Sequence, residues 1–124
     1  MINLLKTHAR VLTTAAATLA MLAFASGCEK LKARDALNKG VAAYKATKYE
    51  EAARKFKESI EADPEFEVAR LYLATSYMSQ WIPGADSPEN KAMAKMAEDE
   101  FMKVLAKDPK NKLAIESIAS MRYN

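Results

Sequence analysis

The sequence contains few of the side chains that carry out chemistry. Histidine occurs once, at His8, and cysteine once, at Cys28, so no disulfide can form within the chain. The residues after Cys28 include no His or Cys, which excludes most zinc sites and the Ser-His and Cys-His nucleophile pairs there. The three glycines form no glycine-rich phosphate loop. We therefore expect no catalytic residue, no metal site and no cofactor.

Charge is nearly balanced once the first residues are set aside. Two of the 19 basic residues precede Cys28, which leaves 17 basic against 16 acidic residues in the remainder. Nucleic-acid binding needs a clustered basic face, so no nucleic-acid partner is expected. The run Glu98-Asp99-Glu100 is acidic, but adjacent helical residues point apart. We interpret it as a solvated face and not as an acid pair.

Residues 1–27 differ in composition from the rest of the chain. The first ten residues carry two basic side chains and no acidic one, and the next fifteen are apolar apart from three threonines. This is the form of a secretory signal peptide. A transmembrane helix is the alternative, but residues 11–27 would span roughly 25 Å, short of the roughly 30 Å hydrocarbon core. A signal peptide over residues 1–27 is therefore favoured.

The end of this segment, Ala25-Ser26-Gly27-Cys28, resembles the lipobox of bacterial lipoproteins. In that family the small residues mark the cleavage point and the thiol is acylated, although Leu is more usual where Ala25 stands. The resemblance implies that Cys28 carries acyl chains, palmitate among them, followed by a short tether over residues 28–32. Glu29 follows in place of the Asp that retains lipoproteins at the inner membrane, which favours the periplasmic face of the outer membrane. The alternative is an incidental free cysteine behind an ordinary signal peptide.

Apolar residues recur at helical spacing through the rest of the chain, and no segment alternates strongly enough to be a strand. Asp63-Pro64 and Asp108-Pro109 should each end a helix, because the residue before proline is pushed out of the α region. Ser87-Pro88 is typical of an N-cap followed by proline in the first turn. The predicted helices cover residues about 33–44, 49–60, 66–81, 88–107 and 111–122.

An internal repeat appears when the two Asp-Pro pairs, whose prolines are 45 residues apart, are aligned. In each copy an Ala lies twelve residues before the proline, a Phe eight before it and an Ile or Leu four before it. The small residues let helices approach closely, and the Phe rings fill the space between layers. The matched pairs are Ala52 with Ala97, Phe56 with Phe101, Ile60 with Leu105, Gly40 with Ala74 and Val68 with Leu113.

This pattern resembles the tetratricopeptide repeat (TPR), a helix-turn-helix unit of about 34 residues. The resemblance implies an all-α, TPR-type solenoid of about five helices, in which each pair buries its apolar stripe by stacking on the next. Repeat 1 departs from the family pattern at Lys39, usually apolar, and at Ser59, usually Ala. The implied TPR domain, 33–124, comprises repeat 1 (33–66), repeat 2 (67–111, with an 11-residue insertion at about 81–91) and a capping helix (112–124). The capping helix would turn outward Glu116, Ser117 and Ser120.

TPR proteins usually hold a peptide in the concave groove lined by the first helix of each pair. The family's carboxylate clamp, which binds the C-terminal peptides of chaperones, needs Lys and Asn where this chain has Leu37, Val41 and Tyr72. We therefore reject such a peptide as the ligand. A mixed aromatic and aliphatic groove better suits an amphipathic helix or an extended segment. The alternative is that these residues only complete the core of a short stack. Carried over by position, the groove would be lined by Arg34, Leu37, Asn38, Val41, Tyr44, Lys45, Val68, Leu71, Tyr72, Thr75 and Met78.

The insertion is a second candidate contact surface, because it puts Trp81 at the edge of a loop and lengthens the helix that carries Met93 and Met96. Aromatic and Met side chains are enriched at interfaces. The alternative is that Trp81 packs under its own loop.

Together these patterns predict a lipid-anchored TPR lipoprotein that binds another envelope protein and catalyses nothing. The membrane would be contacted through the lipid on Cys28. The alternative is a structural protein that associates with further copies of itself through its apolar final helix.

Overall fold

The computed structural model describes residues 27–123, and these form five α-helices and no strand. An N-terminal helix occupies residues 27–45. It is followed by α2 (Tyr49–Ala62), α3 (Glu67–Met78), α4 (Pro88–Lys107) and α5 (Lys112–Tyr123). The expected all-α, solenoid-like fold is therefore confirmed. Ala25 and Ser26 of the lipobox lie outside the described residues.

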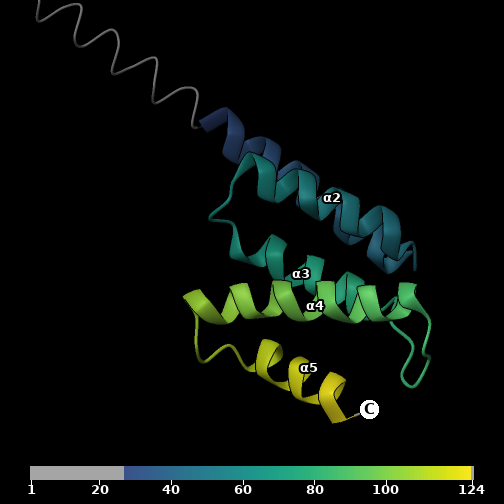
Figure 1. Cartoon of the computed structure of the whole chain (residues 1–124). Helices are drawn as coiled ribbons and strands as arrows, with labels where there is room; N and C mark the ends of the chain where they lie inside the picture. The colour runs from purple at the N-terminus through teal and green to yellow at the C-terminus, as the bar shows by residue number, and fades with distance from the viewer. Residues whose placement is uncertain (1–26, 124) are drawn as a thin grey trace, which may run out of the picture.

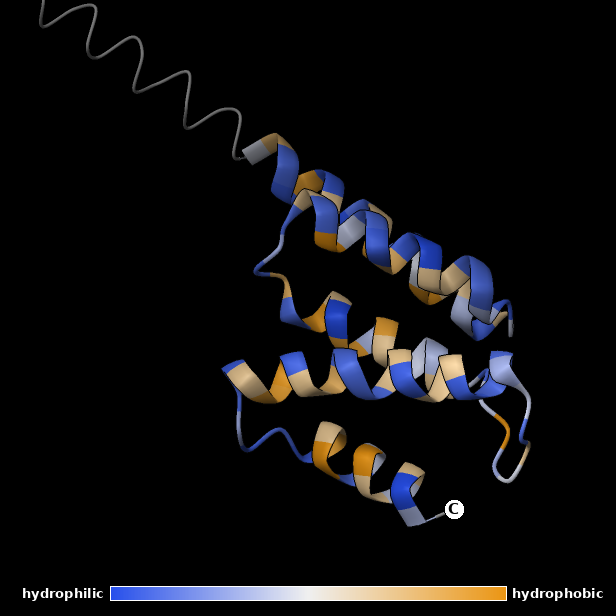
Figure 2. Ribbon diagram, in the orientation of Figure 1, coloured by the Kyte–Doolittle hydropathy of each residue, from blue (hydrophilic) through white to orange (hydrophobic). Residues whose placement is uncertain are grey.

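The helices stack in layers (Figure 1). The N-terminal helix and α2 form the first layer, α3 and α4 the second, and α5 lies alone beyond α4. Bands of hydrophobic and hydrophilic residues alternate along each helix (Figure 2), and the buried hydrophobic residues come from all five helices. The largest fully buried side chains of this core include Phe56, Phe101 and Val104.

Two turns of the same construction join the layers. Asp63 follows α2 with an extended ψ of 94°, and Asp108 follows α4 with a ψ of 87°, so each Asp-Pro pair ends its helix as predicted. In each turn the Asp carbonyl accepts from the amide three residues later, Phe66 at 3.0 Å and Asn111 at 3.1 Å. Each Asp carboxylate also accepts, at 3.2 Å, from the amide two residues later. The two Asp-Pro turns, which lie 45 residues apart, therefore make equivalent hydrogen bonds.

Gly40 and Phe56 set the separation of the first two helices. A Cβ on residue 40 would lie 2.5 Å from Cε1 of Phe56, so only glycine admits the ring at this point. The matched pairs Ala52 with Ala97 and Phe56 with Phe101 are all fully buried. Small residues therefore bring the helices together, and the aromatic rings fill the remaining space.

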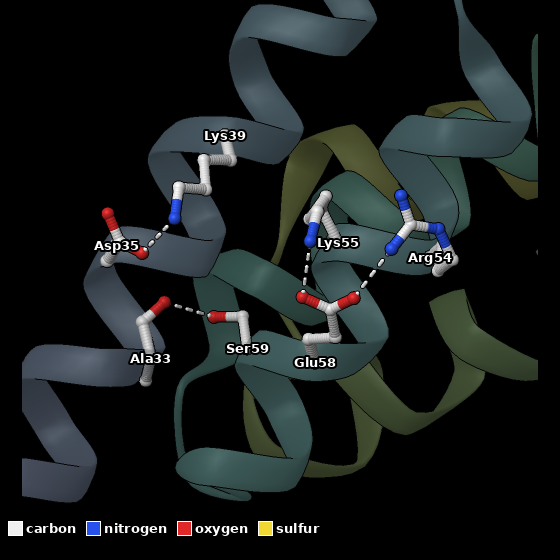
Figure 3. Close-up of polar contacts among 7 residues, drawn as sticks. All are labelled: Ala33, Asp35, Lys39, Arg54, Lys55, Glu58 and Ser59. Atoms are coloured by element: carbon white, nitrogen blue, oxygen red, sulfur yellow. Dashed lines mark hydrogen bonds and ion pairs between the residues drawn. The ribbon is translucent and has the colours of Figure 1, made fainter.

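The two departures from the TPR pattern in repeat 1 have different structural outcomes (Figure 3). Ser59 is fully buried, and its hydroxyl donates to the carbonyl oxygen of Ala33 at 2.7 Å, which ties α2 to the N-terminal helix. Lys39 is exposed and pairs with Asp35 at 2.6 Å on the same helix. The serine replaces an apolar contact with a hydrogen bond, and the lysine remains in solvent.

Two local expectations need correction. Helical spacing in the sequence predicts an apolar stripe of α5 at Leu113, Ile115, Ile118 and Ala119. Ile118 is buried as predicted, but Leu113 and Ile115 are exposed, and the helix buries Ala114 and Ser117 as well. Ser117 therefore faces the core and not solvent, whereas Glu116 and Ser120 face outward as expected. Residues 28–32, expected as a tether, belong to the N-terminal helix.

Candidate partner-binding surface

The groove predicted from the TPR resemblance lies on the N-terminal helix and α3, and its residues fall into two groups. Most of its apolar side chains are half-buried and pack against the core, and Thr75 is half-buried with its hydroxyl donating to Leu71 O at 2.8 Å. The core-packed members are Leu37, Val41, Tyr44, Leu71 and Met78. The exposed members are Arg34, Asn38, Lys45, Val68 and Tyr72.

The groove tyrosines are engaged within the chain. The Tyr44 hydroxyl lies 2.9 Å from the Ser79 hydroxyl, which joins the end of the N-terminal helix to the residue after α3. The Tyr72 ring stacks on Phe56 with centroids 5.3 Å apart and an interplanar angle of 18°. Val68, 47% exposed, is the most open apolar side chain of this set. The core-packed members of the groove therefore help to complete the stack, whereas the other members remain at its surface.

The loop between α3 and α4 (residues 79–87, the α3–α4 loop) contains most of the insertion and is held by one buried side chain. Asn90 Oδ1 accepts from the Ile82 amide at 2.7 Å. Asn90 Nδ2 donates to the carbonyl oxygens of Ile82 and Ala85, both at 2.8 Å. The loop backbone is thus fixed to the first turn of α4 by three hydrogen bonds from one residue.

Local geometry on both sides of Asn90 supports this arrangement. The Ser87 hydroxyl accepts from the Asn90 amide at 3.1 Å, and Pro88 occupies the first turn, so the predicted N-cap is confirmed. Gly84 has a φ of +76°, a left-handed conformation that glycine adopts without strain. The loop backbone is therefore held by hydrogen bonds within the chain itself.

The loop presents an apolar side chain to solvent. Ile82 is 64% exposed, whereas Trp81 beside it is half-buried. The Trp81 amide donates to Tyr77 O at 3.1 Å, which continues the end of α3. Ile82, more than Trp81, is thus the accessible apolar residue of the insertion.

A hollow of about 600 Å³ borders this loop and lies between α2, α3 and α4. Acidic Glu50 and Glu51 line it together with basic Lys57, which lies 5.6 Å from the centroid of the Tyr77 ring. Hydrogen bonding with Tyr77 raises the pKa of Lys57 above its ordinary value. Met93 and Met96, the two methionines on the lengthened helix, also line it. The hollow is mixed in polarity and suits a protein side chain better than a purely apolar ligand.

Sequence reasoning identified Trp81 but missed Ile82 and Asn90. The signal for Asn90 was its position three residues after the Ser87 N-cap, where an amide side chain can reach back over the loop. The signal for Ile82 was an isolated apolar residue directly before Pro83-Gly84, a turn-forming pair. Neither signal specifies burial, so neither could show which of Trp81 and Ile82 faces solvent.

Other kinds of site find no support in the described part of the chain. Within residues 27–123 no three His, Cys, Asp or Glu side chains are grouped so as to hold a metal ion. Over the same residues, no helix has the length and apolar character needed to cross a membrane. Cys28 is exposed in the first turn of the described helix.

The chain matches no protein-family model, no curated protein and no solved structure. The resemblance to tetratricopeptide repeats therefore stays a prediction that rests on the internal repeat of the sequence.

Proposed function

We propose that this chain is a lipid-anchored, non-catalytic helical-repeat module of the bacterial cell envelope that binds another envelope protein through the α3–α4 loop. The observation that carries the proposal is the pairing of Ile82, 64% exposed, with a buried Asn90 that fixes the loop around it. An exposed apolar side chain on a fixed backbone loses little entropy when a partner covers it.

We favour the α3–α4 loop over the groove as the binding surface, because most apolar side chains of the groove already pack within the chain. Its aromatic rings already stack or hydrogen-bond within the chain, at Tyr72 and Tyr44. The hollow beside the loop adds Met93 and Met96, whose flexible side chains adapt to a partner surface. This arrangement suits a partner that has an apolar pocket for Ile82, surrounded by both polar and apolar side chains.

The anchor and the loop lie at opposite ends of the molecule. The N-terminal helix begins at one edge of the stack, and the α3–α4 loop lies at the other edge (Figure 1). Residues 27–45 of that helix span roughly 28 Å at about 1.5 Å per residue. Acylation of Cys28 at the beginning of this helix leaves the loop free to reach a partner away from the lipid surface. Glu29 after the cysteine favours the periplasmic face of the outer membrane.

The loop and the groove can be separated by placing a photoreactive amino acid at position 82 or at position 68 of the full chain in native membranes. Both positions carry exposed apolar side chains, so the two probes are matched in exposure and chemistry. Exposed Ala106, on α4 and outside the residues that line the hollow, is the background control. We expect one specific crosslinked protein from position 82, identified by mass spectrometry, and none from position 106.

In a full chain without the photoreactive residue, Ile82→Asp should abolish co-purification of the protein that the crosslink identifies. The melting temperature should be unchanged, because the Ile82 side chain is already in solvent. A specific product from position 68 alone would move the binding surface to the groove. Background products at all three positions would contradict the proposed binding function.

The anchor is tested by growth with a clickable fatty-acid analogue. The wild-type chain should take up the label, and Cys28→Ser should lose it together with membrane association. Label retained by Cys28→Ser would disprove acylation at this residue.

A further inference from the structure

The outer end of the stack carries a second hollow, of about 580 Å³, between α4 and α5. Its lining is mainly apolar and includes Met102, Leu105, Ile115, Ile118 and Tyr123. Ile115 is 46% exposed and Tyr123 is 91% exposed, so nothing in the described part of the chain covers them. None of these residues belongs to the α3–α4 loop, so this surface is distinct from the proposed partner site.

The internal repeat shows what covers the equivalent surface one unit earlier. The 45-residue offset matches Ile118 with Leu73 and Ala119 with Ala74. Leu73 and Ala74 are buried on α3, which packs against both α2 and α4. On α5, Ile118 is also buried and Ala119 is half-buried, so the part of the equivalent surface that no helix within residues 27–123 covers lies around Ile115 and Tyr123.

Two substitutions between the matched positions make the outer surface more apolar than the inner junction. Lys57 corresponds to Met102, and Arg70 corresponds to Ile115. Arg70 on α3 forms an ion pair with Glu100 on α4 at 2.8 Å, whereas the uncharged side chain of Ile115 cannot form such a pair. The outermost unit of a solenoid needs a polar outer face to remain soluble alone. Polar Glu116 and Ser120 also face outward on α5, but the hollow itself is mainly apolar, which is typical of a surface that is covered.

The covering helices inside the chain share one pattern, which α5 also carries. In α2 and α4 a buried Ala precedes a buried Phe by four residues, at Ala52–Phe56 and Ala97–Phe101. In α5, Ala119 precedes Tyr123 by four residues, and this aromatic ring faces solvent. The outer face of α5 thus has both the hollow that receives such a helix and the residues that such a helix inserts.

The charge on this surface is already neutralised within the chain. Arg122, at the edge of the hollow, donates from Nε to Glu98 at 3.0 Å. Because Arg122 is paired with Glu98, the lining of the hollow gives little electrostatic reason to select a charged partner, and it can approach its own copy without strong repulsion.

We propose that α5 of a second copy occupies this hollow, so that two chains pair through their outer ends about a two-fold axis. Each α5 inserts Ala119 and Tyr123 into the other copy's hollow and receives the same two residues in return. Such a contact is isologous, because one surface patch serves both subunits. The pairing goes beyond the proposed function and leaves both α3–α4 loops free.

Two matched variants test the pairing in the full chain, purified in detergent and followed by sedimentation velocity. Ile115→Glu puts a carboxylate into the hollow. Leu113→Glu puts the same charge on the same helix at a side chain of similar exposure, 49%, that does not line the hollow. We expect dimers for the wild type and for Leu113→Glu, and for Ile115→Glu a dimer dissociation constant at least about tenfold higher. Unchanged helical circular dichroism confirms that each variant is folded.

A monomeric wild type at every concentration reached would overturn the proposal, as would equal weakening by the two glutamates. A photoreactive phenylalanine analogue in place of Tyr123 gives a second measurement in native membranes. A product of twice the chain mass supports the pairing, and a product containing a different protein, or no product, overturns it. Ile115→Glu should leave the crosslink from position 82 intact, so failure of the pairing and failure of the proposed function are distinguishable.

Discussion

The ring of Phe56 occupies the space where a side chain on Gly40 would begin. A Cβ at residue 40 would stand 2.5 Å from Cε1 and 2.7 Å from Cδ1 of this fully buried ring. Because the ring is enclosed on all sides, it cannot yield without moving α2 away from the N-terminal helix. This contact makes the first layer sensitive to a single methyl group.

Gly40→Ala is therefore expected to destabilise the domain by about 1–2 kcal/mol. Overpacking costs typically about 1–3 kcal/mol, and the better helix propensity of Ala returns up to about 1 kcal/mol. Thermal unfolding measures the effect. In the background of Phe56→Leu, which vacates the space, the same glycine substitution should become neutral or stabilising. Equal effects in both backgrounds would show that the contact does not determine stability.

Ser59 and Ser76 are both fully buried, but their hydroxyls make different kinds of hydrogen bond. One bond joins two helices, and the other lies within a single helix. Ser59 donates to Ala33 O on the neighbouring helix, whereas Ser76 donates at 2.9 Å to Tyr72 O one turn earlier on its own helix. Ser59→Ala should cost about 1 kcal/mol, although Ala is the usual TPR residue at that position. Ser76→Ala should cost less or slightly stabilise, because such back-bonding adds no tertiary contact. Denaturant unfolding of the two variants measures the difference, and a larger loss for Ser76→Ala would contradict this assignment.

Asn90→Asp tests how the α3–α4 loop is held. The carboxylate can still accept from the Ile82 amide, but it cannot donate to the carbonyl oxygens of Ile82 and Ala85. We expect faster amide hydrogen exchange at the Ile82 amide and loss of crosslinking from position 82. Ser87→Ala is the control, because it removes the N-cap contact and leaves all three loop hydrogen bonds in place. Unchanged exchange at Ile82 in Asn90→Asp would mean that the loop is held by other contacts.

A lysine at the end of α4 controls the titration of Glu65 in the first Asp-Pro turn. Hydrogen bonding with Lys107 lowers the pKa of the Glu65 carboxyl below its ordinary value. A carboxyl whose pKa is lowered by folding stabilises the folded state above its unfolded pKa, and that stabilisation is lost as pH falls through the folded pKa. The effect on stability is small because the pair is solvent-exposed.

NMR titration measures the Glu65 pKa directly. Lys107→Ala should raise it towards the ordinary range, and added salt should do so in part. Glu58 is the internal control, because its pKa is lowered by Lys55 and Arg54 and not by Lys107. An unchanged Glu65 pKa in Lys107→Ala would show that the pair does not persist in solution.

The sequence allowed prediction of those parts of the fold that depend on local rules. Asp63-Pro64, Asp108-Pro109 and Ser87-Pro88 placed three helix ends correctly, because proline restricts the residue before it wherever it occurs. The aligned Ala and Phe positions also identified the core, since a small residue four positions before an aromatic one makes a compact contact between helices.

The buried face of α5 could not be predicted from periodicity alone. Its apolar residues lie on more than one face of the helix. Two of its buried residues, Ala114 and Ser117, are only weakly hydrophobic or polar and do not stand out in a hydrophobic pattern. The repeat alignment does indicate the buried face, because it matches Ala114 with Ala69, which is fully buried. The exposure of Ile82 was equally inaccessible, because it depends on three tertiary hydrogen bonds from Asn90.

The two Asp-Pro turns lie along one edge of the stack, and the turns within helix pairs lie along the other (Figure 1). On the first edge both joints have the same hydrogen bonds, whereas on the second a short turn over residues 46–48 is matched by the nine residues 79–87. The first edge therefore sets the angle between layers, and the second accepts changes in length without altering that angle. A chain built this way can acquire a new recognition loop by lengthening one turn, while the scaffold that carries the loop keeps its shape.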